Sequence, residues 1–332
     1  MASTGIICES TAIKRIQVSK THNSAKLLLK DRLAVSVLKA SLMLSALLPL
    51  QFARGCGRLL GRFLYVVNSK TVRIIRRNIE LAYKDRSFAE QEALVKAAIS
   101  EQGALISEMG HVWRRSPAYV MSKIRVVGQK YFDDVLADQM GVLVLAPHVG
   151  NWEVLPHHLV TQGDLFGLFE PPKLPSVGHE VLANRRRPGG EYVPTTPKGL
   201  VKLIRHFKRG GLTGILPDQV PTQESAGLNV PFMGVECFTA SLCANLLSKS
   251  GAKTIIAGAF RVYGGWEVVY QPVSEAIYSD DLETALRAMN KDIEKLIDGR
   301  DQQYQWSYKR FRTLPRSLAN HYTGVKRRGG KE

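Results

Sequence analysis

The stretch "GVLVLAPHVGNWE", residues 141–153, decides the fold because it joins a short apolar segment directly to a polar turn. Its apolar first half is typical of a strand buried on both faces, as in a parallel sheet. His148, Gly150 and Asn151 follow in the turn, and Glu153 falls in the helix expected next. Ligands of α/β proteins bind outside the carboxyl ends of strands, so this stretch predicts a site as well as a sheet.

Apolar and amphipathic segments alternate along the chain, which is typical of an α/β fold. The expected strands are residues 141–146, 164–170, 212–217 and 252–263. The expected helices are residues 69–84, 87–113, 151–162, 176–187, 198–209, 239–250 and 281–298. Ser87 and Glu90 should form a capping box at the start of the second helix. The predicted fold class is α/β, a single domain with a mainly parallel central sheet flanked by helices.

The basic charge of the chain, +17 overall, is concentrated at its two ends. Residues 1–86 hold 16 Lys and Arg against 4 Asp and Glu, and residues 309–332 hold 8 against 1. Between them, residues 87–308 are close to neutral, with 22 against 24. Basic ends of this kind favour an acidic partner surface, which nucleic acid and anionic membrane both provide.

The segment "LAVSVLKASLMLSALLPL", residues 33–50, favours the membrane over nucleic acid, because only Lys39 interrupts its apolar run. A bilayer span needs about 20 apolar residues, so the segment is of borderline length. We expect a membrane-anchoring helix over residues 31–67, either spanning the bilayer or lying in its interface. A buried core helix is the alternative. No helix-turn-helix, zinc-finger or RNA-binding sheet signature is present, so no nucleic-acid partner is expected.

The cysteines and serines predict no covalent or metal chemistry. Cys8, Cys56, Cys237 and Cys243 form no C-x-x-C pair and no cluster with histidine at zinc spacing. We therefore expect reduced thiols, no metal and no other cofactor. No serine or cysteine lies in a G-x-S-x-G type of nucleophile elbow, so no covalent enzyme intermediate is expected.

His148 and Glu153 are the candidate catalytic pair. A carboxylate one helical turn on could bind one ring nitrogen, fix the tautomer and leave the other nitrogen as a general base. Gly150 would let a substrate approach the backbone closely, and Asn151 would add a hydrogen-bond donor. The alternative is a histidine at a helix start followed by a glutamate that the helix dipole favours. The H-x4-E spacing alone does not separate these two interpretations.

Further motifs follow His148 in a definite order. They are "RRRPGG" at 185–190, "PDQ" at 217–219, "VPFMG" at 230–234 with Thr239 expected to begin a helix, and "QYQWSYKRFR" at 303–312. Together with "HVGNWE", this order resembles the late acyltransferases of lipid A biosynthesis, of the lauroyl and myristoyl transferase type. That family is part of the wider H-x4-D/E lysophospholipid acyltransferase superfamily. The resemblance covers about residues 40–316.

The resemblance implies roles for particular residues. His148 would be the general base and Glu153 its partner. Arg185 and Arg187 would face substrate phosphate or the catalytic carboxylate, with a solvated basic face as the alternative. The residues of the "PDQ" stretch, Asp218 and Gln219, would shape the substrate site. The residues matched in the terminal stretch, for which a structural role is expected, are Trp306, Lys309, Arg310 and Arg312.

The resemblance also implies a reaction and its partners. An acyl thioester, of acyl carrier protein or else of coenzyme A, would donate a fatty acyl chain to a hydroxyl of a lipid A precursor. The segment "LFEPPKLPS", residues 168–176, departs from better-known members, so a lysophospholipid or another membrane lipid stays open as the acceptor. A non-catalytic membrane lipid-binding protein is the alternative from another class. The expected location is the bacterial inner membrane, with the catalytic domain on the cytoplasmic side and against an anionic membrane surface.

The expected organisation therefore has four parts. Residues 1–30 would be a basic, disordered N-terminus, and residues 31–67 the membrane anchor. Residues 68–316 would form the single catalytic acyltransferase domain, and residues 317–332 a basic C-terminal tail.

Overall fold

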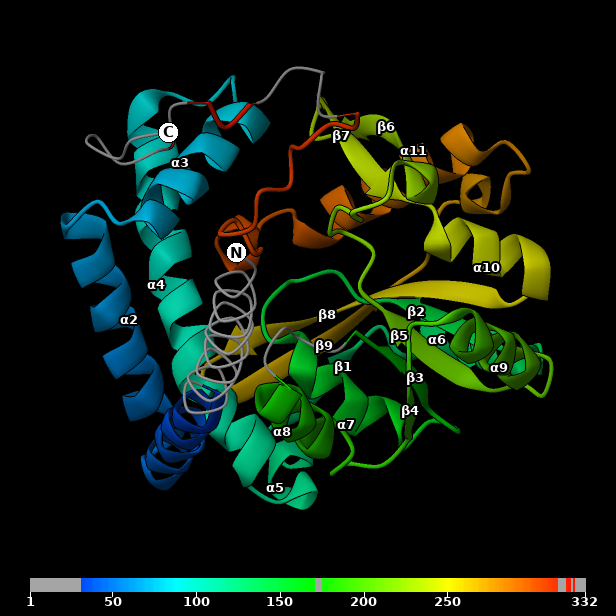
Figure 1. The fold of residues 1–332 in the computed structure, drawn as a ribbon, viewed down its shortest axis with the longest axis horizontal. Coiled ribbons are helices and arrows are strands. Elements are labelled where there is room, and N and C mark those ends of the chain that lie inside the picture. The colour runs from blue at the N-terminus through cyan, green and yellow to red at the C-terminus, as the bar shows by residue number, and fades with distance from the viewer. Residues whose placement is uncertain (1–30, 171–174, 316–320, 324, 326–332) are drawn as a thin grey trace, which may run out of the picture.

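The computed structural model describes residues 31–170, 175–315, 321–323 and 325 (Figure 1). The predictions for residues 1–30, and for most of the tail 317–332, lie outside these described residues.

A sheet of five strands, in the order β1-β9-β8-β2-β5, forms the centre of the described structure. β2 lies parallel to both β5 and β8, β1 lies parallel to β9, and only β8 and β9 pair antiparallel. The prediction of a mainly parallel central sheet is thus confirmed. The strands are β1 (Ile124–Val127), β2 (Val142–Leu145), β5 (Leu212–Ile215), β8 (Lys253–Val262) and β9 (Gly265–Gln271).

Two smaller sheets accompany the central one. A parallel pair, β3 (Phe166–Phe169) and β4 (Glu191–Pro194), adjoins β5 through a bridge between Leu165 and Leu212. An antiparallel hairpin is formed by β6 (Gly227–Phe232) and β7 (Val235–Ala240).

Thr239, predicted to begin a helix, lies instead in β7, where it pairs with Leu228. The helix that follows has Ser241 as its N-cap, so that prediction was wrong by a few residues. The "VPFMG" motif before it is the end and turn of the hairpin, because Met233 and Gly234 adopt positive φ angles.

Helices cover both faces of the central sheet, and β2 shows why. Leu143 and Leu145 belong to the core shared with α3, α4, α9, α10 and α11, whereas Val142 and Val144 belong to the core shared with α6 and α7. Successive side chains of a strand point to opposite faces, so an apolar run such as this one fills two cores.

The helices after β1 are α6 (Gln129–Ala137), α7 (Leu155–Leu159), α8 (Pro175–Arg185), α9 (Pro197–Phe207), α10 (Leu242–Ser250) and α11 (Leu282–Ile297). The 3-10 turns are η1 (Trp152–Val154), η2 (Glu224–Ala226), η3 (Glu275–Tyr278) and η4 (Asp301–Gln303).

The N-terminal part is helical and packs beside the sheet (Figure 1). Residues 31–47 are helical, and α2 (Leu50–Val66), α3 (Lys70–Ala82), α4 (Phe88–Arg114) and α5 (Pro117–Met121) follow. The predicted capping box at the start of α4 is present. α2 and α4 approach closely at Gly57, Gly61 and Gly103, where an added Cβ would clash with the backbone of the other helix.

Among the described residues, no helix is both long and apolar enough to cross a bilayer. The structure therefore does not support the membrane anchor predicted for residues 31–67. The apolar run 33–50 is divided in the structure, because the first helix ends at residue 47 and α2 begins at Leu50. The sequence of α2 mixes apolar residues with three arginines, of which Arg54 is buried against the protein.

The close approach of α2 and α4 generates a first prediction. Gly57→Ala should lower the free energy of unfolding by about 1–3 kcal/mol, because the new methyl group meets the Gly103 carbonyl in a packed interface. Urea unfolding followed by circular dichroism would measure the change.

Gly55→Ala is the matched control, since nothing lies within 4 Å of a Cβ at Gly55 in the same helix. That variant should gain up to about 1 kcal/mol from helix propensity. Equal effects of the two substitutions would contradict the packing role of Gly57.

Candidate active site

His148 and Asp218 meet at the carboxyl edge of the central sheet. β2 and β5 are parallel neighbours, so the loops that leave their ends lie side by side. His148 Nδ1 lies 2.7 Å from Asp218 Oδ1, and the His148 backbone N–H donates to Asp218 Oδ2 at 3.0 Å. Asp218 therefore holds both the ring and the backbone of the histidine.

The second ring nitrogen of His148 faces Gln219. The side-chain N–H of Gln219 donates to His148 Nε2 at 3.0 Å, so this nitrogen carries a lone pair while Nδ1–H donates to Asp218. The ring also packs edge-on against Trp152, with 4.6 Å between ring centroids. Its side chain is only 11% exposed. A histidine held in this tautomer is arranged as a general base at Nε2.

The Asp218 carboxyl is ionised. Its complete burial would raise its pKa, but the electrostatic interaction and the hydrogen bonds with His148, together with the charge of Arg310, lower the pKa below the ordinary value. A buried carboxylate beside the imidazole also stabilises the imidazolium that forms when the base takes a proton.

Glu153, expected to be the partner of His148, is bound elsewhere in the structure. Its carboxylate accepts from the Arg185 guanidinium, with Nε 3.1 Å from each oxygen, and from Trp113 Nε1 at 3.3 Å. The expectation assumed a regular helix after His148. Gly150 has a φ of 56° and the 3-10 turn starts only at Trp152, so the two side chains do not share a helix face.

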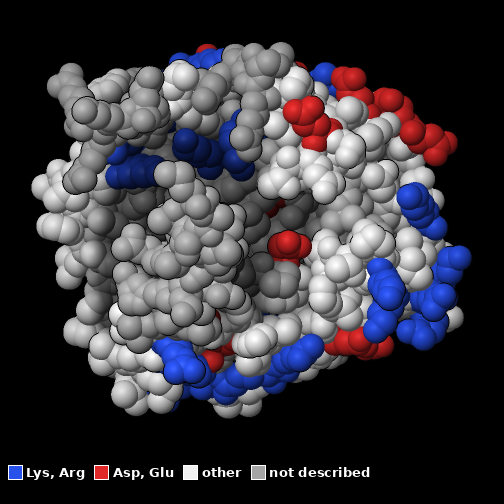
Figure 2. Space-filling model, viewed as in Figure 1, with Lys and Arg blue, Asp and Glu red and all other residues white. Residues whose placement is uncertain are grey.

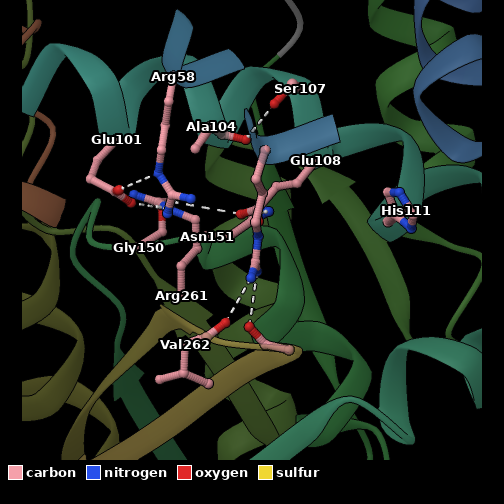
Figure 3. A network of polar contacts seen from close by, with 12 residues as sticks. Arg58, Glu101, Ala104, Ser107, Glu108, His111, Gly150, Asn151, Arg261 and Val262 are labelled. Atoms are coloured by element: carbon pink, nitrogen blue, oxygen red, sulfur yellow. Dashed lines mark hydrogen bonds and ion pairs between the residues drawn. The ribbon is translucent and has the colours of Figure 1, made fainter. Parts of the chain in front are cut away.

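Gly150 and Asn151 support the loop rather than offering free donors. The Gly150 N–H donates to the Gln303 carbonyl, and the Asn151 N–H to the Ala259 carbonyl. The Asn151 side-chain amide donates to Glu108 at 2.8 Å (Figure 3). A Cβ at Gly150 would clash with the Ala259 carbonyl, and its positive φ also requires glycine. The expected role of Asn151 as a hydrogen-bond donor for a substrate therefore does not fit this geometry.

A buried charge network anchors this loop to the N-terminal helices (Figure 3). Glu108 of α4 lies between Asn151 and Arg54 of α2, with a 2.6 Å ion pair to the latter. Arg261 of β8 donates to the Gly150 carbonyl at 2.7 Å and pairs with Glu101 at 2.8 Å. Sequence reasoning missed this network, although two glutamates one heptad apart inside an apolar helix were a signal for it.

An apolar pocket of about 530 Å³, part of it open to solvent, is lined by Trp152, the residue that packs against the His148 ring. Glu153, Arg185 and Trp152 border it, and Tyr192 lines it. Its other lining residues are Ala146, Leu155, Pro156, Leu159, Leu165, Gly167, Leu168, Gly214 and Leu216.

The site residues expected from the sequence thus fall into two groups. His148, Asp218 and Gln219 form one, and Glu153 with Arg185 forms the other at the pocket border. Arg187 belongs to neither, because its guanidinium is bonded to the Trp113 backbone carbonyl.

The fold is α/β, and the site places a histidine held by a buried carboxylate next to Trp152 of an apolar pocket. The chain belongs to the bacterial lipid A biosynthesis acyltransferase family, whose model matches residues 20–313. It is 24% identical over 277 residues to the lipid A biosynthesis lauroyltransferase of Escherichia coli K12, covering 82% of this chain and 89% of that relative. The myristoyltransferase of the same organism is 24% identical (81% and 83% covered), and the palmitoleoyltransferase 26% (73% and 79%). The protein is therefore an acyltransferase, as the resemblance implied.

The geometry of the pair generates a second prediction. Asp218→Asn should lower kcat by about 10²- to 10⁴-fold with a smaller change in KM, because a neutral amide has one acceptor oxygen for the two N–H groups of His148 and no charge to stabilise the imidazolium. Steady-state acyl transfer with purified protein would measure both constants.

Glu153→Gln is the comparison that separates the two carboxylates. It should change KM for the acyl donor more than kcat, since Glu153 borders the pocket through Arg185. A loss in kcat for Glu153→Gln with little effect of Asp218→Asn would restore Glu153 as the partner of His148.

Proposed function

We propose that this protein transfers a fatty acyl chain from an acyl thioester to a hydroxyl of a lipid A precursor, with His148 and Asp218 as its base and orienting carboxylate. The observation that carries the proposal is the lone pair of His148 Nε2 beside an apolar pocket. Membership of the lipid A acyltransferase family supports the reaction class.

The proposed chemistry is direct transfer. The acceptor hydroxyl displaces the Gln219 amide from His148 Nε2 and gives its proton to that nitrogen. The alkoxide oxygen attacks the thioester carbonyl, the tetrahedral intermediate expels the thiolate, and the imidazolium protonates the thiolate. Asp218 stabilises the imidazolium throughout. An ester bond forms, a thioester bond breaks, and no covalent enzyme intermediate is needed.

The pocket beside His148 is the proposed site of the acyl chain. Its leucines and Pro156 provide apolar contact, and Ala146 and Trp152 place its start next to the base. The Glu153–Arg185 pair at its border would orient the polar part of a substrate. Acyl carrier protein is the proposed donor, because an acidic carrier complements the basic balance of the chain.

The N-terminal helices are the proposed contact with an anionic membrane surface. Many large apolar side chains are exposed along residues 31–47 and α2, and the arginines Arg58 and Arg62 lie among them. Apolar faces flanked by basic residues bind the interface of anionic bilayers. We place the protein at the bacterial inner membrane, with its catalytic domain on the cytoplasmic side. The exposed side chains are Leu33, Val37, Met43, Leu44, Leu47, Phe52, Leu59, Leu60, Phe63, Val66 and Val67.

The direct test is acyl transfer from acyl carrier protein thioesters to a lipid A precursor, with His148→Ala beside the wild type. Loss of a general base should lower kcat by about 10²- to 10⁴-fold. An undiminished rate of acyl transfer by His148→Ala would contradict the mechanism. Transfer by the wild type to a lysophospholipid but not to the lipid A precursor would move the acceptor to another lipid.

Chain-length preference gives a further prediction. Gly214 of β5 lines the pocket, and an added Cβ would make ordinary contact with Leu159. Gly214→Val should therefore shorten the preferred acyl chain by filling the pocket without disturbing the strand. Competition among thioesters of several lengths, read by mass spectrometry, would measure it.

Gly163→Val is the matched control, because Gly163 is exposed and has open space around its Cβ position. It should leave the preference unchanged. An unchanged preference in Gly214→Val would place the acyl chain elsewhere.

A further inference from the structure

Three basic side chains, Lys70, Lys309 and Arg312, form what we call the terminal cation cluster. Lys70 begins α3, and the other two follow η4 in the extended C-terminal segment. Burial first, and then the charges of Lys70 and Arg312, lower the pKa of the Lys309 ammonium. Asn78 of α3 donates to the carbonyls of Trp306 and Tyr308, which holds α3 against the terminal segment.

Protein groups hold this cluster without neutralising it. The Lys309 ammonium lies 5.0 Å from the centre of the Tyr322 ring, and Arg312 stacks over Tyr308 at 5.2 Å. Arg312 Nε donates to the Lys309 carbonyl at 3.2 Å. Within the part of the chain that the structure describes, none of the three cations forms an ion pair with a carboxylate.

The neighbouring Arg310 shows the contrast. It is buried, and its guanidinium donates to the Phe238 carbonyl, Thr239 and Asn290. The structural role expected for the whole terminal stretch therefore fits Arg310 and the buried Trp306. Lys309 and Arg312 make no comparable contact with the core, so their charges remain available.

The cluster adjoins the catalytic base through one short chain of contacts. Arg312 stacks on Tyr308, whose hydroxyl accepts from the Val220 N–H at 2.9 Å. Val220 follows Gln219, whose amide donates to His148 Nε2. Figure 2 shows Lys and Arg side chains beside the hollowed part of this face, where Figure 1 places α3 and the C-terminal segment. An anion bound by the cluster would thus lie at the edge of the site.

We propose that Lys70, Lys309 and Arg312 bind a phosphate ester of one of the two substrates, an inference that rests on the proposed function. The cations converge from two segments on one small region. Such a region suits a compact dianion better than it suits carboxylates that are spread over the surface of a partner protein. Arginine binds phosphate through paired N–H donors, and lysine adds a point charge. The phosphate belongs either to the acceptor lipid or to the pantetheine arm of the donor, and its source is a matter for experiment.

The kinetic test compares the double variant Lys309→Ala/Arg312→Ala with the wild type on a phosphorylated lipid A precursor and on the same lipid after phosphatase treatment. KM for the phosphorylated lipid should rise at least about tenfold, the factor for roughly 1.4 kcal/mol of lost charge-assisted contact. KM for the treated lipid should be the same in both proteins. The second arm compares a phosphopantetheine thioester with its phosphate-free pantetheine analogue as donor.

Lys208→Ala/Arg209→Ala is the matched control, because it removes the same charge from exposed residues at the opposite, amino-terminal end of β5. It should change none of these constants. The conservative variant Lys309→Arg, with Arg312 kept, should have a KM for the phosphorylated substrate close to that of the wild type. If KM rises only for the donor that carries phosphate, the site binds the donor. An equal rise in KM with and without phosphate in both arms, or no rise, overturns the proposal.

Equilibrium binding separates this proposal from the proposed function. His148→Ala protein should bind the phosphorylated precursor in detergent micelles, or the phosphopantetheine thioester, more tightly than the triple variant that also carries Lys309→Ala/Arg312→Ala. Such binding without any acyl transfer by the wild type would keep the site and discard the reaction. Transfer by the wild type with unchanged KM values in the double variant would keep the reaction and discard the site.

Discussion

The paired hydrogen bonds between His148 and Asp218 are the interaction on which the rest of the site depends. They require β2 and β5 to be adjacent and parallel, so that the two carboxyl-end loops meet. Asp218 holds the histidine at both its backbone and its ring, which leaves Nε2 toward Gln219. The position of Trp152, and with it the start of the apolar pocket, follows from the same loop.

The loop that carries His148 is held by buried charged residues of α2, α4 and β8. Isolated buried ions are costly, and their removal one at a time leaves a partner uncompensated. Glu108 is matched by Arg54 and the Asn151 amide, and Arg261 by Glu101 and the Gly150 carbonyl. The helices that present apolar side chains to solvent are thus connected to the loop that carries His148.

The arginines and lysines behind the net charge of +17 lie in different physical environments. Arg54 and Arg310 are buried and hydrogen-bonded to protein groups, and Arg185 is paired at the border of the pocket. Lys309 and Arg312 are held by aromatic rings, and no carboxylate among the described residues pairs with them. The environment of each basic residue thus depends on the fold, which a count of charges does not reveal.

The sequence by itself determined the α/β class, the strand that leads to His148, the capping box of α4, and the placement of Asp218 and Gln219 at a strand end. These follow from local periodicity and from the rule that parallel strands present their carboxyl ends together. The strands β1, β4 and β9 and the hairpin of β6 and β7 escaped prediction. β1 pairs with β9, which lies far along the chain, whereas the hairpin pairs locally where a helix had been expected to begin at Thr239. Only the tertiary structure decided that His148 pairs with Asp218 while Glu153 pairs with Arg185. The direction of a side chain after a left-handed glycine depends on backbone torsions that contacts with β8 impose, and residue spacing along the chain does not encode them.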